Sequence, residues 1–439
     1  MKPRSVLAFF LLAALFLFSG CGGDDVPNVV CRSENYSFTA DMAAYMAAYT
    51  KLALADEMAA AVMDDSKPLA GQTSADGESF EDYLFEVTVQ NIEKILLYCE
   101  AARADGYVPG EGMIYKANET VTYLSSKAEE AGMTAEEYLK ESFGDKVTLS
   151  GYQTCVEMMV LCEGYELSLI SAEEVTSDEA EAYADSHSGD FLKFDALRYS
   201  TSDRELAEML ASSETSEDFL KIISSVSGIS VTDKNKNKIP DEIEVYAAVS
   251  ADPAGEFASE EGRSRWDTYM SESDGSYTVT MLLTLPHRDE EPVWNFRALY
   301  ISSESNSDPM YEAESLLEQW KEKQGGETGF SNLAARYSDN PTAYYGGLFS
   351  GISRDDMPST KVADWICSSG RIAGDTAVVD DGDDGAYMLY YIDGNIPRWK
   401  YTASQAVKAE RIDQKMSESE EEIKKSFVFD NDALRKLIK

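Results

Sequence analysis

The stretch DKNKNKIPDEIE, residues 233–244, carries oxygen-bearing side chains at a spacing that suits a cation. In a twelve-residue loop, the positions 1, 3, 5, 9 and 12 are Asp233, Asn235, Asn237, Asp241 and Glu244. A calcium ion takes about six to eight oxygen ligands, and this spacing wraps the backbone so that the side chains converge. The sequence therefore predicts a Ca2+ site here, with a lysine-rich polar surface loop as the alternative.

The pattern D-x-N-x-N-x-I-P-D-x-x-E resembles the calcium loops of thrombospondin type-3 repeats and dockerins. Lys238 stands where such loops normally have glycine. A non-glycine residue in the left-handed conformation of that turn costs about 1 kcal/mol. Calcium is the single cofactor considered, and none is expected to be required.

Other metal chemistry is not supported by the residues. The two histidines, His187 and His287, are far apart in the sequence, and we expect them on the surface. No C-x-x-C pair is formed by the cysteines that follow residue 21, which are Cys31, Cys99, Cys155, Cys162 and Cys367. A structural zinc site is therefore not expected, and the odd number argues against a disulfide framework.

The N-terminus has the features of a bacterial lipoprotein signal. Lys2 and Arg4 precede an apolar run, residues 6–18, that is too short for a comfortable membrane span. Small residues then lead directly to Cys21. We expect cleavage before Cys21 and its lipidation, so that the protein is anchored by lipid on the extracytoplasmic face of the cell membrane. An ordinary secretory signal with an incidental cysteine is the alternative.

The composition indicates a soluble, multidomain protein. The chain has 439 residues, of which 44% are hydrophobic, so two to four domains with buried cores are expected. Its net charge is −42. This acidity repels nucleic acid and anionic lipid headgroups, so neither is an expected partner of the protein surface, and the lipid on Cys21 is the expected membrane contact.

The first part of the chain has a helical pattern up to about residue 180. Apolar residues recur at helical spacing through residues 80–104, and Gly106 ends that run. Two capping boxes, Thr134 with Glu137 and Thr176 with Glu179, mark the starts of further helices. We therefore predict an all-helical N-terminal unit.

The rest of the chain alternates between strands and helices and contains an internal repeat. The motif F-x-A-L occurs at residues 194–197 and again at 296–299, each time followed by a charged helix, an irregular middle and an aromatic-rich strand. Two successive α/β modules of about one hundred residues each fit this pattern. A charged amphipathic helix near the C-terminus follows them.

The second module resembles the parvulin family of peptidyl-prolyl isomerases, and the whole chain resembles extracytoplasmic foldases of the SurA/PrsA type. The motifs that carry the resemblance follow one another in order, and they are Arg297-Ala298-Leu299-Tyr300, residues 330–339 (FSNLAARYSD), Gly346-Gly347-Leu348, Met357, Gly374-Asp375 and residues 385–389 (GAYML). The expected fold is thus an α+β multidomain protein. Its expected parts are a signal peptide (1–20), a helical chaperone-like domain (21–187), a degenerate parvulin-like module that includes the calcium loop (188–290), a parvulin-like module (293–400), and a C-terminal helix that packs on the N-terminal domain (401–439).

The resemblance also locates a site, in which this chain departs from the family. Parvulins have two histidines where this chain has Ala298 and Tyr387. Asn340 replaces a Cys or Asp, and Asp384 replaces a Ser or Thr. In the family these four positions form a hydrogen-bonded cluster beneath the twisted prolyl amide. The substrate pocket of the family is expected at Leu348, Phe349 and Met357.

Prolyl isomerisation needs no nucleophile, because binding the twisted amide in an apolar pocket already lowers a rotation barrier of about 18–20 kcal/mol. The lost histidines remove much of the electrostatic support for the twisted state. The resemblance therefore implies a foldase or chaperone for unfolded or proline-containing secreted chains, with weak or absent isomerase activity. Two alternatives remain, an active isomerase in which Tyr387 donates in place of histidine, and a calcium-stabilised surface adhesin. The double glycine at 346–347 is expected to let the backbone pass closely beneath the closing strand of the module, residues 386–393.

Overall fold

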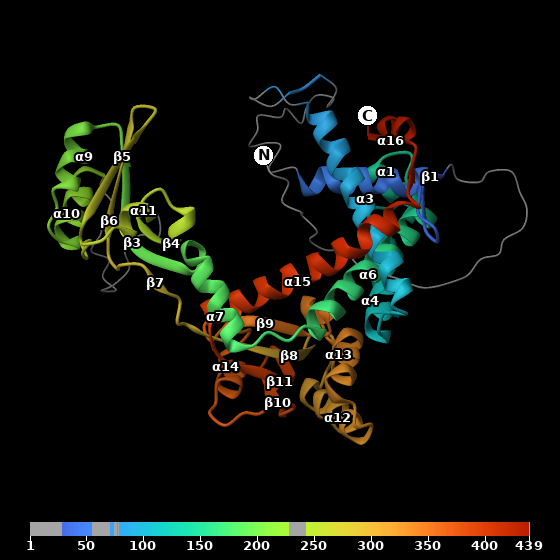
Figure 1. The fold of residues 1–439 in the computed structure, drawn as a ribbon. Coiled ribbons are helices and arrows are strands. Elements are labelled where there is room, and N and C mark those ends of the chain that lie inside the picture. The colour runs from blue at the N-terminus through green and yellow to red at the C-terminus, as the bar shows by residue number, and fades with distance from the viewer. Residues whose placement is uncertain (1–28, 55–70, 74–76, 78, 228–242, 439) are drawn as a thin grey trace, which may run out of the picture. The chain divides into compact units, whose positions relative to one another are not determined.

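The computed structural model describes residues 29–54, 71–73, 77, 79–227 and 243–438. It contains both helices and sheets, which confirms the expected α+β class. The chain forms two compact units, shown in Figure 1. The first consists of residues 1–174, 294–393 and 409–439, and the second of residues 175–293 and 394–408.

The N-terminal part of the first unit is helical. Its helices are α1 (Ala40–Ala53), α3 (Phe80–Ala104), α4 (Glu111–Glu130), α5 (Ala135–Phe143) and α6 (Leu149–Ala172). Their apolar faces share one core, and among its fully buried members are Phe38, Met46, Leu84, Ile92 and Ile95. The capping box at the start of α5 forms as predicted, with Thr134 and Glu137 satisfying each other's backbone N–H groups. Helix α4 lies within the range that was predicted to be helical, but its bounds were not predicted from the sequence.

The C-terminal segment completes this helical core. Helix α15 (Arg398–Lys424) passes from the second unit into the first, where Ile412 and Met416 are buried beside Tyr98 and Cys162. Strand β12 (Val428–Phe429) pairs antiparallel with β1 (Val29–Arg32), which also pairs with β2 (Ser37–Thr39). Helix α16 (Asn431–Ile438) follows, and its Leu434 is 1% exposed in the core.

The first unit also holds a four-stranded sheet in the order β10-β11-β8-β9. Its strands are β8 (Pro292–Ser302), β9 (Leu348–Ser353), β10 (Thr376–Asp380) and β11 (Gly385–Pro397). Helices α12 (Pro309–Glu322) and α13 (Gly326–Tyr337) connect β8 to β9 through a short 3-10 helix, η2 (Pro341–Tyr345), and α14 (Thr360–Ile366) connects β9 to β10. Helices α12 and α13 cover one face of the sheet and α14 the other, as Figure 1 shows.

The second unit contains a second sheet, in the order β4-β3-β6-β5 with a short β7 beside β3. Its strands are β3 (Leu192–Thr201), β4 (Glu244–Ala248), β5 (Thr268–Ser273), β6 (Ser276–Leu282) and β7 (His287–Arg288). Helices α7 (Ser177–Ser186) and α8 (Ser188–Phe191) precede the sheet, α9 (Arg204–Ala211) and α10 (Ser216–Ser227) follow β3, and the 3-10 helix η1 (Val249–Ala251) and α11 (Gly255–Ser259) follow β4. Thr176 and Glu179 form the predicted capping box at the start of α7.

The two sheets have the same topology. If the four main strands of each sheet are numbered 1 to 4 in chain order, the strands lie side by side in the order 2-1-4-3. This order is β9-β8-β11-β10 in the first unit and β4-β3-β6-β5 in the second. Two helices follow the first strand in both, and one short α-helix lies between the second and the third. The internal repeat inferred from the sequence therefore corresponds to a repeated arrangement of strands and helices.

The two F-x-A-L motifs occupy equivalent places in these sheets. Each lies on the first strand, β3 or β8. In both copies the Phe and Ala side chains face the short helix that lies between the second and third strands. Phe194 and Ala196 pack near α11. Phe296 and Ala298 pack near α14. The Leu that follows, Leu197 or Leu299, faces the helix pair instead. Alternation along a strand sends these neighbours to opposite faces, so the repeated motif marks both layers of both modules.

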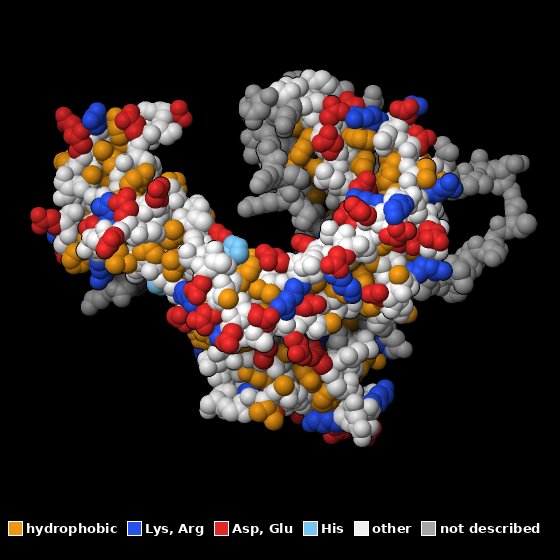
Figure 2. Space-filling model, in the orientation of Figure 1, with side chains coloured by type: hydrophobic (Ala, Val, Ile, Leu, Met, Phe, Trp, Pro, Cys, Tyr) orange, Lys and Arg blue, Asp and Glu red, His pale blue; other side chains and the backbone are white. Residues whose placement is uncertain are grey.

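No helix within the described residues has the length and apolar character needed to cross a membrane. Figure 2 shows acidic side chains scattered over the surface in view rather than gathered on a single element.

Candidate functional site

The two positions at which the sequence predicted replaced histidines, Ala298 and Tyr387, lie on the face of the sheet covered by α14. Ala298 is on β8 and is 1% exposed, and its N–H donates a hydrogen bond to the Gly347 carbonyl at 2.8 Å. Tyr387 is on β11, is 6% exposed and belongs to the same buried cluster. The two slots that hold histidines in the family are thus occupied by a methyl group and a phenol inside a packed layer.

Tyr387 is part of an aromatic pair at the end of this layer. Its ring centroid lies 4.6 Å from that of Tyr300 on β8. Burial raises the pKa of Tyr387 to about 12, and the nearby Asp381, Tyr300 and Asp384 add to this rise. The phenol is therefore neutral at physiological pH, where it can donate a hydrogen bond but does not ionise.

Asp384 approaches this pair through its backbone. Its carbonyl oxygen accepts hydrogen bonds from the Tyr300 hydroxyl at 2.6 Å and from the Ser303 N–H at 3.0 Å. The Asp384 side chain is exposed. The structure therefore brings Ala298 and Tyr387 into one cluster and places Asp384 at its rim.

Asn340 has a separate local role. Its side-chain oxygen accepts hydrogen bonds from the Thr342 N–H at 2.9 Å and from the Thr342 hydroxyl at 2.8 Å, and so caps η2. This cap satisfies donors at the start of that short helix. Asn340 is not among the residues of the cluster that contains Ala298 and Tyr387.

The three predicted pocket residues are placed differently from one another. Met357 is 8% exposed and lies in the cluster with Ala298 and Tyr387. Phe349 is half-buried and stacks on Phe296, with ring centroids 4.8 Å apart and planes within 1°. Leu348 is half-buried and is not a described member of this cluster. Stacked rings and a thioether therefore fill much of the face on which the sequence predicted a proline pocket.

The segment that leads to these residues is anchored to β8. The Ser338 hydroxyl oxygen accepts hydrogen bonds from the N–H groups of Tyr300 and Asn340, and the Asp339 N–H donates to the Tyr300 carbonyl at 2.8 Å. The Asp339 carboxylate accepts from the Ser302 N–H at 2.9 Å. The Ser-Asp pair after α13 thus fixes the end of this helix to the first strand.

The double glycine is explained by the same strand, which corrects the expectation from the sequence. Gly346 and Gly347 have φ values of 61° and 72°, in the left-handed region. A Cβ on Gly347 would overlap the carbonyl oxygen of Ala298, and one on Gly346 would overlap Ser331. The backbone passes closely against the opening strand β8 and helix α13, and not beneath the closing strand β11.

Most residues of the predicted calcium loop, and the predicted lipidation site, are outside the described residues. These are Asp233, Asn235, Asn237, Asp241 and Cys21. Glu244 is described, and it is the exposed first residue of β4. In the described part of the chain, no group of three or more His, Cys, Asp or Glu side chains is arranged to hold a metal ion.

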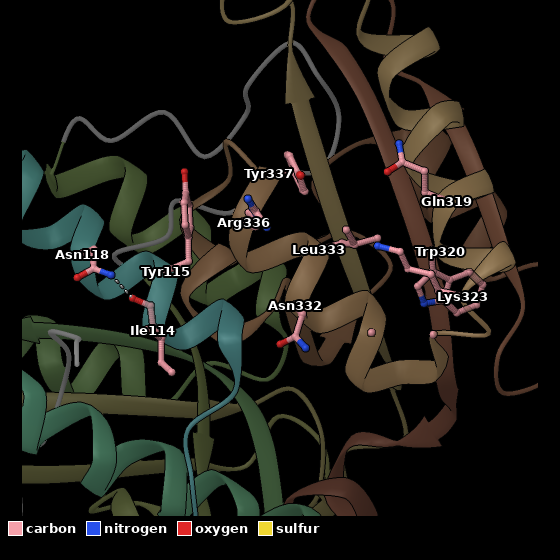
Figure 3. Close-up of a pocket in the computed structure, with 12 residues that line it drawn as sticks. Ile114, Tyr115, Asn118, Gln319, Trp320, Lys323, Asn332, Leu333, Arg336 and Tyr337 are labelled. Carbon is pink, nitrogen blue, oxygen red and sulfur yellow. Dashed lines mark hydrogen bonds between the residues drawn. The ribbon is translucent and has the colours of Figure 1, made fainter. Parts of the chain in front are cut away.

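A groove that the sequence did not reveal lies in the first unit, between α4 on one side and α12 with α13 on the other. Figure 3 shows residues from all three helices around it. Its volume is about 510 Å3, within the range of small-ligand sites. The lining includes aromatic, aliphatic and basic side chains, among them Tyr115, Trp320, Leu333, Arg336 and Tyr337. No signal in the sequence indicated that α4 and α13 come together to form this groove.

Comparisons with known proteins do not assign this chain to a family. Neither the scan against protein-family models nor the search of curated proteins finds a match. Among solved structures, the crystal structure of PrsA from Bacillus subtilis is similar over 81% of this chain and 80% of that chain. The sequence identity is 11% and the TM-score is 0.21. A TM-score this low leaves the likeness without weight for the function proposed below.

Proposed function

We propose that this protein is a lipid-anchored extracytoplasmic foldase or chaperone with weak or absent prolyl isomerase activity. Its clients would be unfolded or proline-containing secreted polypeptides. The observation that carries the proposal is the burial of Ala298 and Tyr387 at the two slots where the family has histidines. The same module keeps the motif residues Ser338-Asp339, Gly346-Gly347 and Met357. A methyl group cannot donate a hydrogen bond to a twisted amide, and the phenol lies within a filled aromatic layer.

Two assays on the same preparation test this proposal. A protease-coupled assay on a proline tetrapeptide measures isomerisation, and light scattering of a chemically denatured client measures suppression of aggregation. We expect no acceleration of isomerisation above the uncatalysed rate, together with suppression of aggregation at near-equimolar protein. Tyr387→Phe is a suitable variant, because it removes one hydroxyl and keeps the ring that packs on Tyr300.

The outcomes separate this proposal from its competitors. Acceleration of isomerisation that is lost in both Tyr387→Phe and Met357→Ala would establish an active isomerase with a phenol in place of histidine. Suppression of aggregation that is unchanged in Tyr387→Phe would favour the chaperone. Failure of both assays would contradict the proposal and favour a surface adhesin. The calcium loop and the lipid on Cys21 stay predictions within this proposal.

A further inference from the structure

The groove between α4 and the helix pair α12–α13 has an unusual charge for this protein. The whole chain has 80 acidic and 38 basic residues. None of the twelve residues that line the groove is acidic, and two of them, Lys323 and Arg336, are basic. Neither basic side chain forms an ion pair within the described part of the chain, although many Lys and Arg residues elsewhere do. The groove lining therefore carries two positive charges on an acidic molecule, while the Glu119 carboxylate on α4 lies beside Tyr115 at its edge.

Arg336 is held by aromatic rings rather than by a carboxylate. Its guanidinium lies 5.8 Å from the centroid of the Tyr115 ring on α4 and 5.5 Å from that of Tyr337 on α13. Figure 3 shows Tyr115 and Arg336 next to each other across the two helices. Cation–π contacts orient a guanidinium without using its N–H groups, which stay available for a bidentate bond to a carboxylate.

The rest of the lining suits a polypeptide with an apolar side chain. Ile114 and Leu333 are partly buried apolar residues, and Trp320 is fixed by its indole N–H, which donates to the Gly326 carbonyl at 2.9 Å. The Trp320 ring also makes edge contacts with Phe330 and Tyr390. A rigid aromatic wall of this kind loses little conformational freedom when a ligand side chain packs on it.

Side-chain amides surround this apolar part. They belong to Asn118, Gln319 and Asn332, one from each helix of the groove. The Asn118 amide nitrogen donates to the Ile114 carbonyl at 3.2 Å, and the Gln319 amide nitrogen donates to the Ser315 hydroxyl at 3.3 Å. The side-chain oxygens of these two amides can accept from the N–H groups of an extended peptide backbone, which would otherwise be desolvated on binding.

We propose that this groove binds an extended polypeptide segment in which an aromatic side chain lies next to a carboxylate. The carboxylate would pair with Arg336, and the aromatic side chain would pack against Trp320 and Leu333. This inference rests on the proposed chaperone function and names the client segments that it takes. The net charge of −42 repels strongly acidic clients at long range, so segments with a single carboxylate are the expected ligands.

The test uses two labelled peptides, acetylated and amidated, that differ in one group. One contains a central Phe-Asp-Leu and the other Phe-Asn-Leu, and fluorescence polarisation measures their dissociation constants with the whole protein. We expect the aspartate peptide to bind about tenfold more tightly, since it alone forms a charge-assisted pair. The double variant Tyr115→Ser with Arg336→Gln is expected to lose that preference.

A matched double variant controls for nonspecific effects. Tyr123→Ser with Lys321→Gln removes one tyrosine of α4 and one positive charge, and neither residue lines the groove. This control is expected to keep the tenfold preference. The inference is wrong if both peptides bind equally, if the groove variant binds like the control variant, or if polyphosphate alone binds more tightly than the aspartate peptide. Aggregation suppression measured alongside separates the two ideas, because its absence in the unmodified protein would overturn the chaperone function itself.

Discussion

At the scale of single residues, several motif residues of the four-stranded module serve to fix its backbone. Gly346, Gly347, Ser338 and Asp339 all make contacts that fix the backbone near β8. Ala298, at a position where the family has a hydrogen-bonding group, is buried in an apolar layer. These four residues therefore have structural roles, whereas the methyl group of Ala298 offers no hydrogen bond to a ligand.

Gly347→Ala is expected to destabilise the first unit by about 3 kcal/mol, because it combines left-handed backbone strain with a steric overlap on β8. Gly370→Ala is the matched control, since Gly370 also has a positive φ, 85°, but no atom lies within 4 Å of its added Cβ. That change should cost about 1 kcal/mol. Urea unfolding followed by tryptophan fluorescence compares the two, and equal costs would contradict the close approach to Ala298.

Glu163 on α6 makes the stability of the folded protein depend on pH. Burial raises the pKa of Glu163, while its hydrogen bond with Tyr345 partly opposes this rise. The folded state therefore holds this proton more tightly than the unfolded state does. The resulting stabilisation is complete below the unfolded carboxyl pKa and is lost as the pH rises through the higher pKa of the folded state.

Glu163→Gln is accordingly expected to increase the free energy of unfolding at neutral pH and to have less effect near the unfolded carboxyl pKa. Urea unfolding across this pH range measures the difference. Glu93→Gln on α3 is the comparison, because Glu93 pairs with Lys424 at 2.9 Å and its replacement should lower stability instead. A Glu163 variant whose effect does not change with pH would contradict this account.

At the scale of elements, the terminal segments of the chain build one core with the N-terminal helices. Strand β12 pairs with β1, and α16 packs on α1 and α3. Beside Leu434, the Arg435 guanidinium lies 4.0 Å from the Phe85 ring centroid and pairs with Asp82 at 2.6 Å. The helical part of the first unit therefore depends on residues more than three hundred positions away in the sequence.

Leu434→Ala should lower the stability of the first unit by about 3 kcal/mol, since it leaves a cavity at a site that is 1% exposed. The same substitution at Leu52, which is 63% exposed on α1, is expected to change stability by less than about 0.5 kcal/mol. Thermal unfolding by calorimetry measures both variants. Similar melting temperatures for the two would show that α16 is not part of the cooperative core.

The repeated topology also shows which element-level features could be read from the sequence. The first strand of each module was recognised through F-x-A-L, because a buried strand needs apolar residues on both faces. The edge strands β4, β5, β9 and β10 were not recognised, since they are short and only partly buried. The bounds of α4, within the predicted helical range, were not recognised for a related reason, because many of its described side chains are exposed and its apolar stripe is weak.

At the scale of the whole molecule, the net charge of −42 is the dominant property. Self-repulsion among carboxylates destabilises a compact state, and salt screens it over about 10 Å at 0.1 M ionic strength. Many ion pairs of the structure are exposed, so screening them costs little.

We therefore expect the melting temperature to rise by several degrees between about 20 mM and about 500 mM sodium chloride. Differential scanning calorimetry measures the rise, and choline chloride at equal ionic strength distinguishes screening from binding of sodium. A fall in melting temperature with salt would mean that attractive ion pairs outweigh the repulsion.

The sequence by itself determined the α+β class, several helices with their capping boxes, and the repeat of two modules. These features depend on local patterns, namely apolar periodicity, capping residues and a recurring motif. Only the tertiary structure decided that Gly347 approaches β8, that Asn340 caps η2 while Tyr387 is buried against Tyr300, and that α4 joins α13 to form a cationic groove. Those features depend on which distant segments pack together, and side-chain packing between elements leaves no fixed spacing in a single sequence.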